Sequence, residues 1–185
     1  GVSLGNLAGH VAKCGGMGVI STAHTGYRCD DFWQNFLEDN LTEIKNEIQK
    51  LKKEKDAVIL AHYYVDGEVQ EIADYVGDSY YLAEIATKVP ESTIVFCGVS
   101  FMGESAKILN PKKRVVMADG HADCPMAQMV DVDKIREVRK EYPDVSVVCY
   151  VNSTAEIKAE SDVCVTSSNA LKIVKNLPNK DIFFI

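Results

Sequence analysis

The chain has 185 residues, of which 46% are hydrophobic and 25% charged, an ordinary composition for a soluble globular protein. Its formal net charge of −7 argues against a nucleic-acid-binding or membrane-surface role. No stretch approaches the roughly 18 apolar residues of a membrane span, and residues 1–7 lack the pattern of a signal peptide, so a cytoplasmic protein is expected.

The first forty residues differ in composition from those that follow. Residues 1–40 are glycine-rich and predict a serine-capped helix that stops at Gly15–Gly16, followed by a short strand over 17–21. From about residue 41, apolar residues recur at helical spacing with Lys and Glu between them. Asn40 or Thr42 is the expected cap of that second helix.

Apolar strands then alternate with helices along the chain. The expected strands are Ala57–Ala61, Thr93–Gly98, Arg114–Ala118, Val145–Val151, Asp162–Thr166 and Asp181–Ile185. The expected helices are Glu68–Val76, Tyr80–Lys88, Phe101–Leu109, Asp131–Glu141 and Ser168–Asn176. This alternation predicts an α/β fold with parallel sheet covered on both faces. In such sheets ligands bind beyond the carboxyl ends of the strands.

Part of the chain resembles another part of itself. Residues 58–97 align without a gap on 146–185, and the identical pairs include Glu68 with Glu156 and Ser79 with Ser167. Strand, polar turn, serine, helix, proline and strand follow in the same order in both copies. The pattern predicts duplicated structural units. The second copy stops midway, so the chain is expected to be a piece of something longer.

The ends of the strands contain the candidate functional residues. His62 follows a buried strand, where it binds an anion, moves a proton, or is a histidine satisfied within the core. Tyr150 and Asn152 occupy the corresponding position in the second copy, where they bind a ligand or hydrogen-bond within their loop. Ser79 and Ser167 each precede a predicted helix. They either cap those helices or form paired anion sites at the helix N-termini.

The six cysteines include no Cys-x-x-Cys pair, which argues against a zinc ribbon. Cys97, Cys149 and Cys164 lie in apolar runs and are predicted to be small buried hydrophobes. Cys124 differs because it lies in a polar loop beside Asp123 and a proline. Such a thiol suits a metal or a nucleophilic role as well as a structural one.

Five collinear motifs resemble the quinolinate synthase family over residues 41–185. They are Ile59-Leu60-Ala61-His62-Tyr63-Tyr64, Asp74-Tyr75-Val76-Gly77-Asp78-Ser79, Asp123-Cys124-Pro125-Met126-Ala127, Tyr150-Val151-Asn152-Ser153-Thr154 and Thr166-Ser167-Ser168-Asn169-Ala170. The resemblance implies three-layer αβα units with parallel sheet, the first complete and the second partial. It also implies a transferase that condenses iminoaspartate with dihydroxyacetone phosphate to quinolinate in NAD biosynthesis.

The resemblance further implies roles for particular residues and a cofactor. Cys124 would be one ligand of a [4Fe–4S] cluster whose two other cysteine ligands are absent from this chain. The residues that would bind substrate are His62, Ser79, Tyr150, Asn152 and Ser167. Tyr64 would act in catalysis together with His62. The partners expected are the small-molecule substrates and the L-aspartate oxidase that supplies iminoaspartate.

Residues 1–40 resemble a different family. Ser3–Ala8 and Gly15–Ala23 are similar to an early βα segment of the nitronate monooxygenases, which are flavin-dependent (β/α)₈ barrels. The chain is therefore expected to join a foreign segment, 1–40, to a first unit, 41–124, and a truncated second unit, 125–185. The truncated chain alone is expected to be inactive. The alternative functions are a nitronate-oxidising flavoprotein and a non-catalytic remnant.

Overall fold

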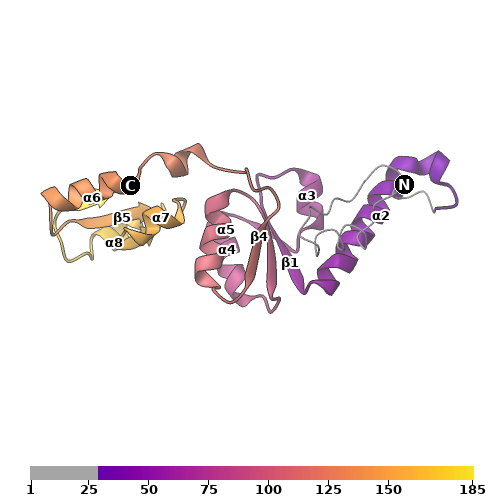
Figure 1. Ribbon diagram of the computed structural model, residues 1–185, viewed down its shortest axis with the longest axis horizontal. Helices are drawn as coiled ribbons and strands as arrows, with labels where there is room; N and C mark the ends of the chain where they lie inside the picture. Colours follow the sequence, from indigo (N-terminus) through magenta and orange to yellow (C-terminus); the bar gives the residue numbers. More distant parts are fainter. Residues whose placement is uncertain (1–28) are drawn as a thin grey trace. The chain divides into compact units, whose positions relative to one another are not determined.

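The computed structural model describes residues 29–185, so the helix and strand predicted within residues 1–28 lie outside the described residues. The chain divides into two compact units, 1–57 and 58–185, and each is considered by itself. The described part of the first unit is essentially one helix, whereas the second unit carries two sheets (Figure 1). Within the described part of the chain, no helix is long and apolar enough to cross a membrane.

Helix α2, Phe32–Glu54, begins earlier than the sequence predicted. Its N-terminal flanking residue is Asp31, so the prediction that Asn40 or Thr42 caps it was wrong. No glycine or proline interrupts residues 31–40, and the helical conformation therefore extends back through them, with one non-helical residue at Asn35.

The first sheet of the second unit has four strands in the order β2-β1-β3-β4. Its elements are β1 (Ala57–His62), α3 (Gly67–Ile72), β2 (Tyr75–Gly77), α4 (Ser79–Lys88), β3 (Thr93–Cys97), α5 (Ser100–Leu109) and β4 (Arg114–Met117). The pairs β1–β2 and β3–β4 are parallel, and α4 and α5 lie side by side against the sheet (Figure 1). The predicted helix Glu68–Val76 was wrong at its end, because Tyr75 and Val76 pair with β1 as a strand.

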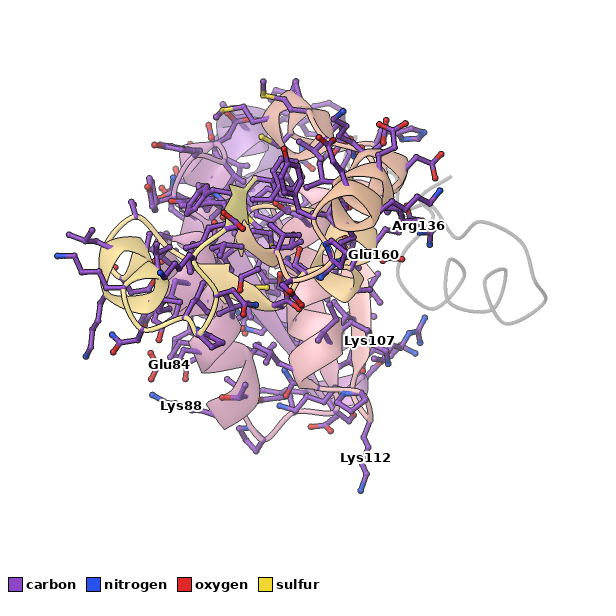
Figure 2. All side chains as sticks on the ribbon, turned by 90° about the vertical axis from the view of Figure 1, so that its left-hand side faces the viewer. Glu84, Lys88, Lys107, Lys112, Arg136 and Glu160 are labelled. Carbon is purple, nitrogen blue, oxygen red and sulfur yellow. The ribbon has the colours of Figure 1, made fainter. Side chains whose placement is uncertain are left out.

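The second sheet has three parallel strands in the order β6-β5-β7. Its region comprises a 3₁₀ turn, Pro125–Gln128, then α6 (Val132–Glu141), β5 (Ser146–Tyr150), α7 (Ala155–Ala159), β6 (Val163–Val165), α8 (Ala170–Val174) and β7 (Ile182–Phe184). The short helix α7 was not predicted. Arg136 on α6 contacts Glu160 at the end of α7 at 2.7 Å, an ion pair that ties these two helices together (Figure 2).

The two sheets repeat the same element order and the same strand register, which confirms the predicted duplication. Leu60 lies opposite Tyr75 in the first sheet, and the aligned residues Val148 and Val163 lie opposite each other in the second. Each copy runs strand, helix, strand, helix, strand. The predicted mixed α/β class with parallel sheets is confirmed.

The repeated identity of Asp74 and Asp162 is explained by a side-chain hydrogen bond to the backbone that both copies form. Asp74 Oδ2 accepts a hydrogen bond from the backbone N–H of Ile59 at 2.8 Å, and Asp162 Oδ2 accepts one from Val147 at 2.7 Å. The backbone N–H of each aspartate also donates to the carbonyl of the same partner residue, at 2.9 Å in both copies. Each aspartate therefore joins the loop before an edge strand to the central strand of its sheet.

Each sheet has its own apolar core. The first core includes Leu60, Leu82, Ile94 and Phe96, all at most 1% exposed. The second core is smaller and is formed by Ile135, Val145, Val147, Cys149 and Ile157. The alternating positions 145, 147 and 149 point to this core because successive side chains of a strand face opposite sides of the sheet.

Replacing Gly77 by alanine is expected to destabilise the second unit by about 1–3 kcal/mol, the usual cost of overpacking. A Cβ atom at Gly77 would lie 2.2 Å from Cδ1 of the Tyr81 ring, so the ring would have to move. Gly67→Ala is the matched control, because nothing lies within 4 Å of a Cβ there. Urea unfolding of both variants measures the difference, and equal midpoints would contradict the prediction.

Candidate functional site

An open cleft of about 1380 Å³ lies within the second unit, at the carboxyl ends of strands β1 to β6. All seven residues singled out from the sequence line it. They are His62, Tyr64, Ser79, Cys124, Tyr150, Asn152 and Ser167. The two copies of the repeat thus direct equivalent strand ends into a single space, as expected for ligand sites in parallel sheets.

His62 ends β1 within a small aromatic cluster. Its ring stacks on Tyr63 with the centroids 4.5 Å apart and meets the ring of Tyr64 edge-on at 4.8 Å. The backbone N–H of Tyr64 donates to Nδ1 of His62 at 3.3 Å. Because Nδ1 accepts this bond, the neutral imidazole carries its proton on Nε2. His62 therefore offers one N–H donor to its surroundings.

The pKa of His62 is lowered from its ordinary value, because burial disfavours the imidazolium, while the carboxylate of Asp78 partly opposes this effect. The imidazole is therefore predominantly neutral at neutral pH. Asp78 also caps α4, since its side chain accepts a hydrogen bond from the backbone N–H of Tyr81 at 2.8 Å. Asp78 thus caps α4 and also stabilises the protonated form of His62.

An NMR titration of the His62 ring protons is expected to give a midpoint below about 6.5, the unperturbed histidine value. Asp78→Asn should lower the midpoint further, because it removes the attraction to the imidazolium while keeping a side chain that can cap α4. Asp66→Asn, which removes another cleft carboxylate, should leave it unchanged.

The lowered pKa of His62 also makes the stability of the fold depend on pH. The unfolded state binds the His62 proton more readily than the folded state, so this contribution to stability is complete above the unfolded pKa. It is lost as the pH falls below that value. A His62 midpoint above that of an unstructured histidine peptide would contradict the prediction.

Ser79 is the first residue of α4, and Asp78, not the serine, is the helix cap. Of the two alternatives considered for Ser79, the one in which it only caps its helix is therefore wrong. The N-terminal residues Asp78, Ser79 and Tyr80 line the cleft. A helix of this length presents free backbone N–H groups and a partial positive charge at that end, which favour an anionic group.

Ser167 reaches the cleft differently from Ser79. It lies in a loop three residues before α8, whereas Ser79 lies within its helix, so the expectation of equivalent helix starts was wrong. The cause is local, because the backbone N–H of Thr166 donates to Oδ1 of Asn169 at 2.8 Å and forms a turn ahead of the helix. The hydroxyls of Ser167 and Tyr150 lie 3.3 Å apart.

Asn152 is half-buried, and its Oδ1 atom has no hydrogen-bond partner among the described residues. A buried amide oxygen without a partner is costly, so a donor from a bound molecule would be favourable at this position.

Cys124 is half-buried, lines the cleft and packs against the first core. Its loop is held by Asp123, which accepts hydrogen bonds from Ser100 Oγ at 2.9 Å, the backbone N–H of Cys124 at 2.8 Å and Gln128 at 3.1 Å. The first two bonds are the main causes of the lowered pKa of Asp123, so this residue stays a carboxylate. Sequence reasoning missed Ser100 and Gln128, whose spacing from Cys124 gives no signal.

The other cysteines of the second unit differ among themselves. Cys97 borders the cleft but is buried, and burial raises the pKa of its thiol. Cys149 is buried, as predicted, whereas Cys164 is exposed, so the prediction for Cys164 was wrong. Its strand β6 has three residues and lies at the edge of the sheet. Within residues 29–185 no three side chains of His, Cys, Asp or Glu form a group able to hold a metal ion.

The cleft lining that the structure describes is acidic. Among residues 29–185, those lining the cleft include four aspartates, Asp66, Asp78, Asp119 and Asp123, and no lysine or arginine. An anionic ligand would therefore depend on hydroxyl groups, backbone N–H groups and His62 for its recognition.

A family model described as quinolinate synthetase A protein matches residues 46–185, which include both copies of the repeat and the whole cleft lining. The chain belongs to the quinolinate synthase family. This assignment confirms the resemblance drawn from the five motifs of residues 41–185. The family is one of enzymes.

Quinolinate synthases of several bacteria are similar to this chain. That of Fusobacterium nucleatum is 66% identical over 142 residues, which are 77% of this chain and 48% of the relative. Those of Caldicellulosiruptor bescii and Clostridium perfringens are 56% and 58% identical over 146 and 143 residues, or 79% and 77% of this chain. The chain therefore spans about half the length of the curated relatives it matches.

Proposed function

We propose that this chain forms part of the catalytic cleft of a quinolinate synthase, a transferase that condenses iminoaspartate with dihydroxyacetone phosphate to quinolinate in NAD biosynthesis. The observation that carries the proposal is that the seven residues selected from the motifs all line one cleft. The family assignment supports the same reaction class.

The binding residues are proposed to divide the recognition of two anionic substrates. The N-terminus of α4 at Ser79 and the paired hydroxyls of Tyr150 and Ser167 suit carboxylate or phosphate oxygens. The unpartnered Oδ1 of Asn152 suits an N–H group, which iminoaspartate has and dihydroxyacetone phosphate lacks.

The proposed proton-transfer groups are His62 and Tyr64. Neutral His62 presents Nε2–H, and its lowered pKa keeps the imidazole unprotonated at neutral pH, the form that acts as a general base. Tyr64 is 81% exposed and stands at the edge of the His62 ring, so its hydroxyl is accessible to a bound molecule.

Cys124 fits the role of one cluster ligand, because its half-buried thiol faces the cleft from a loop fixed by Asp123. A [4Fe–4S] cluster held by three thiolates supplies an open iron that acts as a Lewis acid in dehydration steps. The other two thiolates are proposed to lie outside residues 29–185. Asp123, Ser100 and Gln128 would then keep the Cys124 loop in place whether or not the cluster is bound.

The remaining assignments from sequence stay proposals. Residues 1–40 are proposed to be a segment related to nitronate monooxygenases, followed by a first unit, 41–124, and a second, 125–185. The family match beginning at residue 46 supports this order. We also propose a cytoplasmic location and supply of iminoaspartate by an L-aspartate oxidase.

Binding of dihydroxyacetone phosphate to the purified chain tests the site. In NMR titrations we expect weak, saturable shifts of the His62 ring signals, and Ser79→Ala should weaken binding several-fold by removing a hydroxyl at the start of α4. Thr87→Ala is the matched control, since Thr87 lies at the other end of α4 and its hydroxyl donates to the Glu84 carbonyl. Equal affinities for the two variants would count against Ser79 as a binding residue.

A further inference from the structure

Two cysteines outside the cleft lining lie against each other on neighbouring strands. Cys149 is in β5 and Cys164 is directly opposite it in β6. Their sulfur atoms are 3.4 Å apart, with the Cys149 thiol donating to the Cys164 sulfur. The equivalent positions of the first sheet are Ala61 and Val76, so this strand pairing does not itself require sulfur.

The backbone spacing of the pair suits a covalent link. Neighbouring strands lie about 4.8 Å apart, within the range of about 4.4–6.8 Å that Cα atoms span in disulfides. The two side chains already share one face of the sheet, because their sulfur atoms are in contact. Forming a bond therefore requires a small approach of the two sulfur atoms and no change of strand register.

The two thiols differ in exposure and acidity. Cys149 is fully buried, whereas Cys164 is exposed at the sheet edge. The hydrogen bond from Cys149 is the main cause of the lowered pKa of Cys164; burial opposes it and the positive charge of Lys158 assists it. The same hydrogen bond and burial raise the pKa of Cys149. Cys164 is thus the accessible nucleophile and Cys149 its covered neighbour.

We propose that Cys149 and Cys164 form a redox-active dithiol that a small-molecule disulfide converts into a cross-strand disulfide between β5 and β6. The thiolate of Cys164 attacks one sulfur of the reagent, forms a mixed disulfide and releases one reagent thiolate, which takes a proton. The Cys149 thiol then loses its proton to solvent and attacks the Cys164 sulfur, and the second reagent thiolate leaves and is protonated. Two protein thiols are oxidised and one reagent disulfide is reduced to two thiols.

A disulfide between Cys149 and Cys164 would lie close to residues of the cleft. Cys149 directly precedes Tyr150, and Cys164 lies two residues before Thr166, which starts the loop carrying Ser167. The bond would fix the edge strand β6 to the central strand β5 just before the two hydroxyls that lie 3.3 Å apart in the cleft. The proposal itself does not depend on the reaction proposed for the cleft.

Peptide mapping of the full chain tests the proposal. The chain is incubated with mixtures of oxidised and reduced glutathione, quenched with acid, alkylated and digested after lysine. Cleavage after Lys158 and Lys172 places Cys149 and Cys164 on separate peptides. We expect the two peptides to appear linked, with the loss of two hydrogens, and to separate on reduction. Two unlinked peptides, both alkylated under oxidising conditions that modify the other cysteines, would overturn the proposal.

Two single substitutions test the order of attack. Cys149→Ser should leave a stable glutathione adduct on Cys164, because no neighbouring thiol displaces it. Cys164→Ser should leave Cys149 unmodified, because it is buried. Cys29→Ser, in the other unit, is the control and should not change the linked peptide. Circular dichroism establishes that each variant is folded. An adduct on Cys149 but none on Cys164 would contradict the assigned roles. If one variant unfolds, the peptide map of the unsubstituted chain still decides whether the disulfide forms.

Discussion

Replacing Phe96 by alanine is expected to lower the free energy of unfolding of the second unit by about 3–5 kcal/mol, the cost of removing a buried aromatic side chain. Phe96 is 1% exposed and packs in the core with Leu60, Leu82 and Ile94. A loss of this size is a large part of the roughly 5–15 kcal/mol that stabilises a typical domain. Urea unfolding followed by circular dichroism measures it.

The repeat provides a matched control for this substitution. Phe184 occupies the position of the second copy that aligns with Phe96, but it is 50% exposed. Phe184→Ala should therefore cost much less, although it removes the same atoms from an equivalent strand. Equal losses for the two variants would show that burial in this structure does not set the energetics of the two sheets.

The second large expectation concerns the 185-residue chain as a catalyst: by itself it should make no quinolinate. A stable cubane needs at least three thiolates, and Cys124 is the cleft cysteine best placed to give one. Cys97 is buried with a raised pKa, and Cys149 and Cys164 are hydrogen-bonded to each other away from the cleft. The cleft is also open, which exposes a reacting imine to water.

Anaerobic reconstitution with iron and sulfide, followed by iron counting and a quinolinate assay, measures this directly. We expect substoichiometric iron and no turnover, with Cys124→Ala behaving like the parent chain. Four irons per chain with turnover that Cys124→Ala abolishes would show the opposite, namely that the chain, alone or as an oligomer, completes the site.

Most strands could be predicted because buried parallel strands have continuous apolar sequences. β1 and β5 show this, and both were located to within a residue or two at each end. The edge strand β2 could not be found in this way. Its residues Tyr75 and Val76 are part exposed, and only pairing with β1 and the Asp74 contact to Ile59 make them a strand.

In the candidate site, too, some features could be predicted from the sequence and others could not. Residue types at strand ends and the repeat identified His62, Ser79 and Tyr150 as positions of interest, and the five motifs related residues 41–185 to an enzyme family. The positioning bonds of Asp123 to Ser100 and Gln128 had no sequence signal, because they depend on a loop folding back onto the start of α5. The same is true of the loop that holds Ser167 ahead of α8.

The sequence by itself determined the alternation of strands and helices, the duplication and the family, since these depend on local composition and on order along the chain. Only the tertiary structure decided that both copies open into one cleft and that Cys164 is exposed while Cys149 is buried. The physical reason is that exposure and proximity are set by strand order. Cys149 and Cys164 have similar apolar neighbours in sequence, but β5 is central and β6 is at an edge.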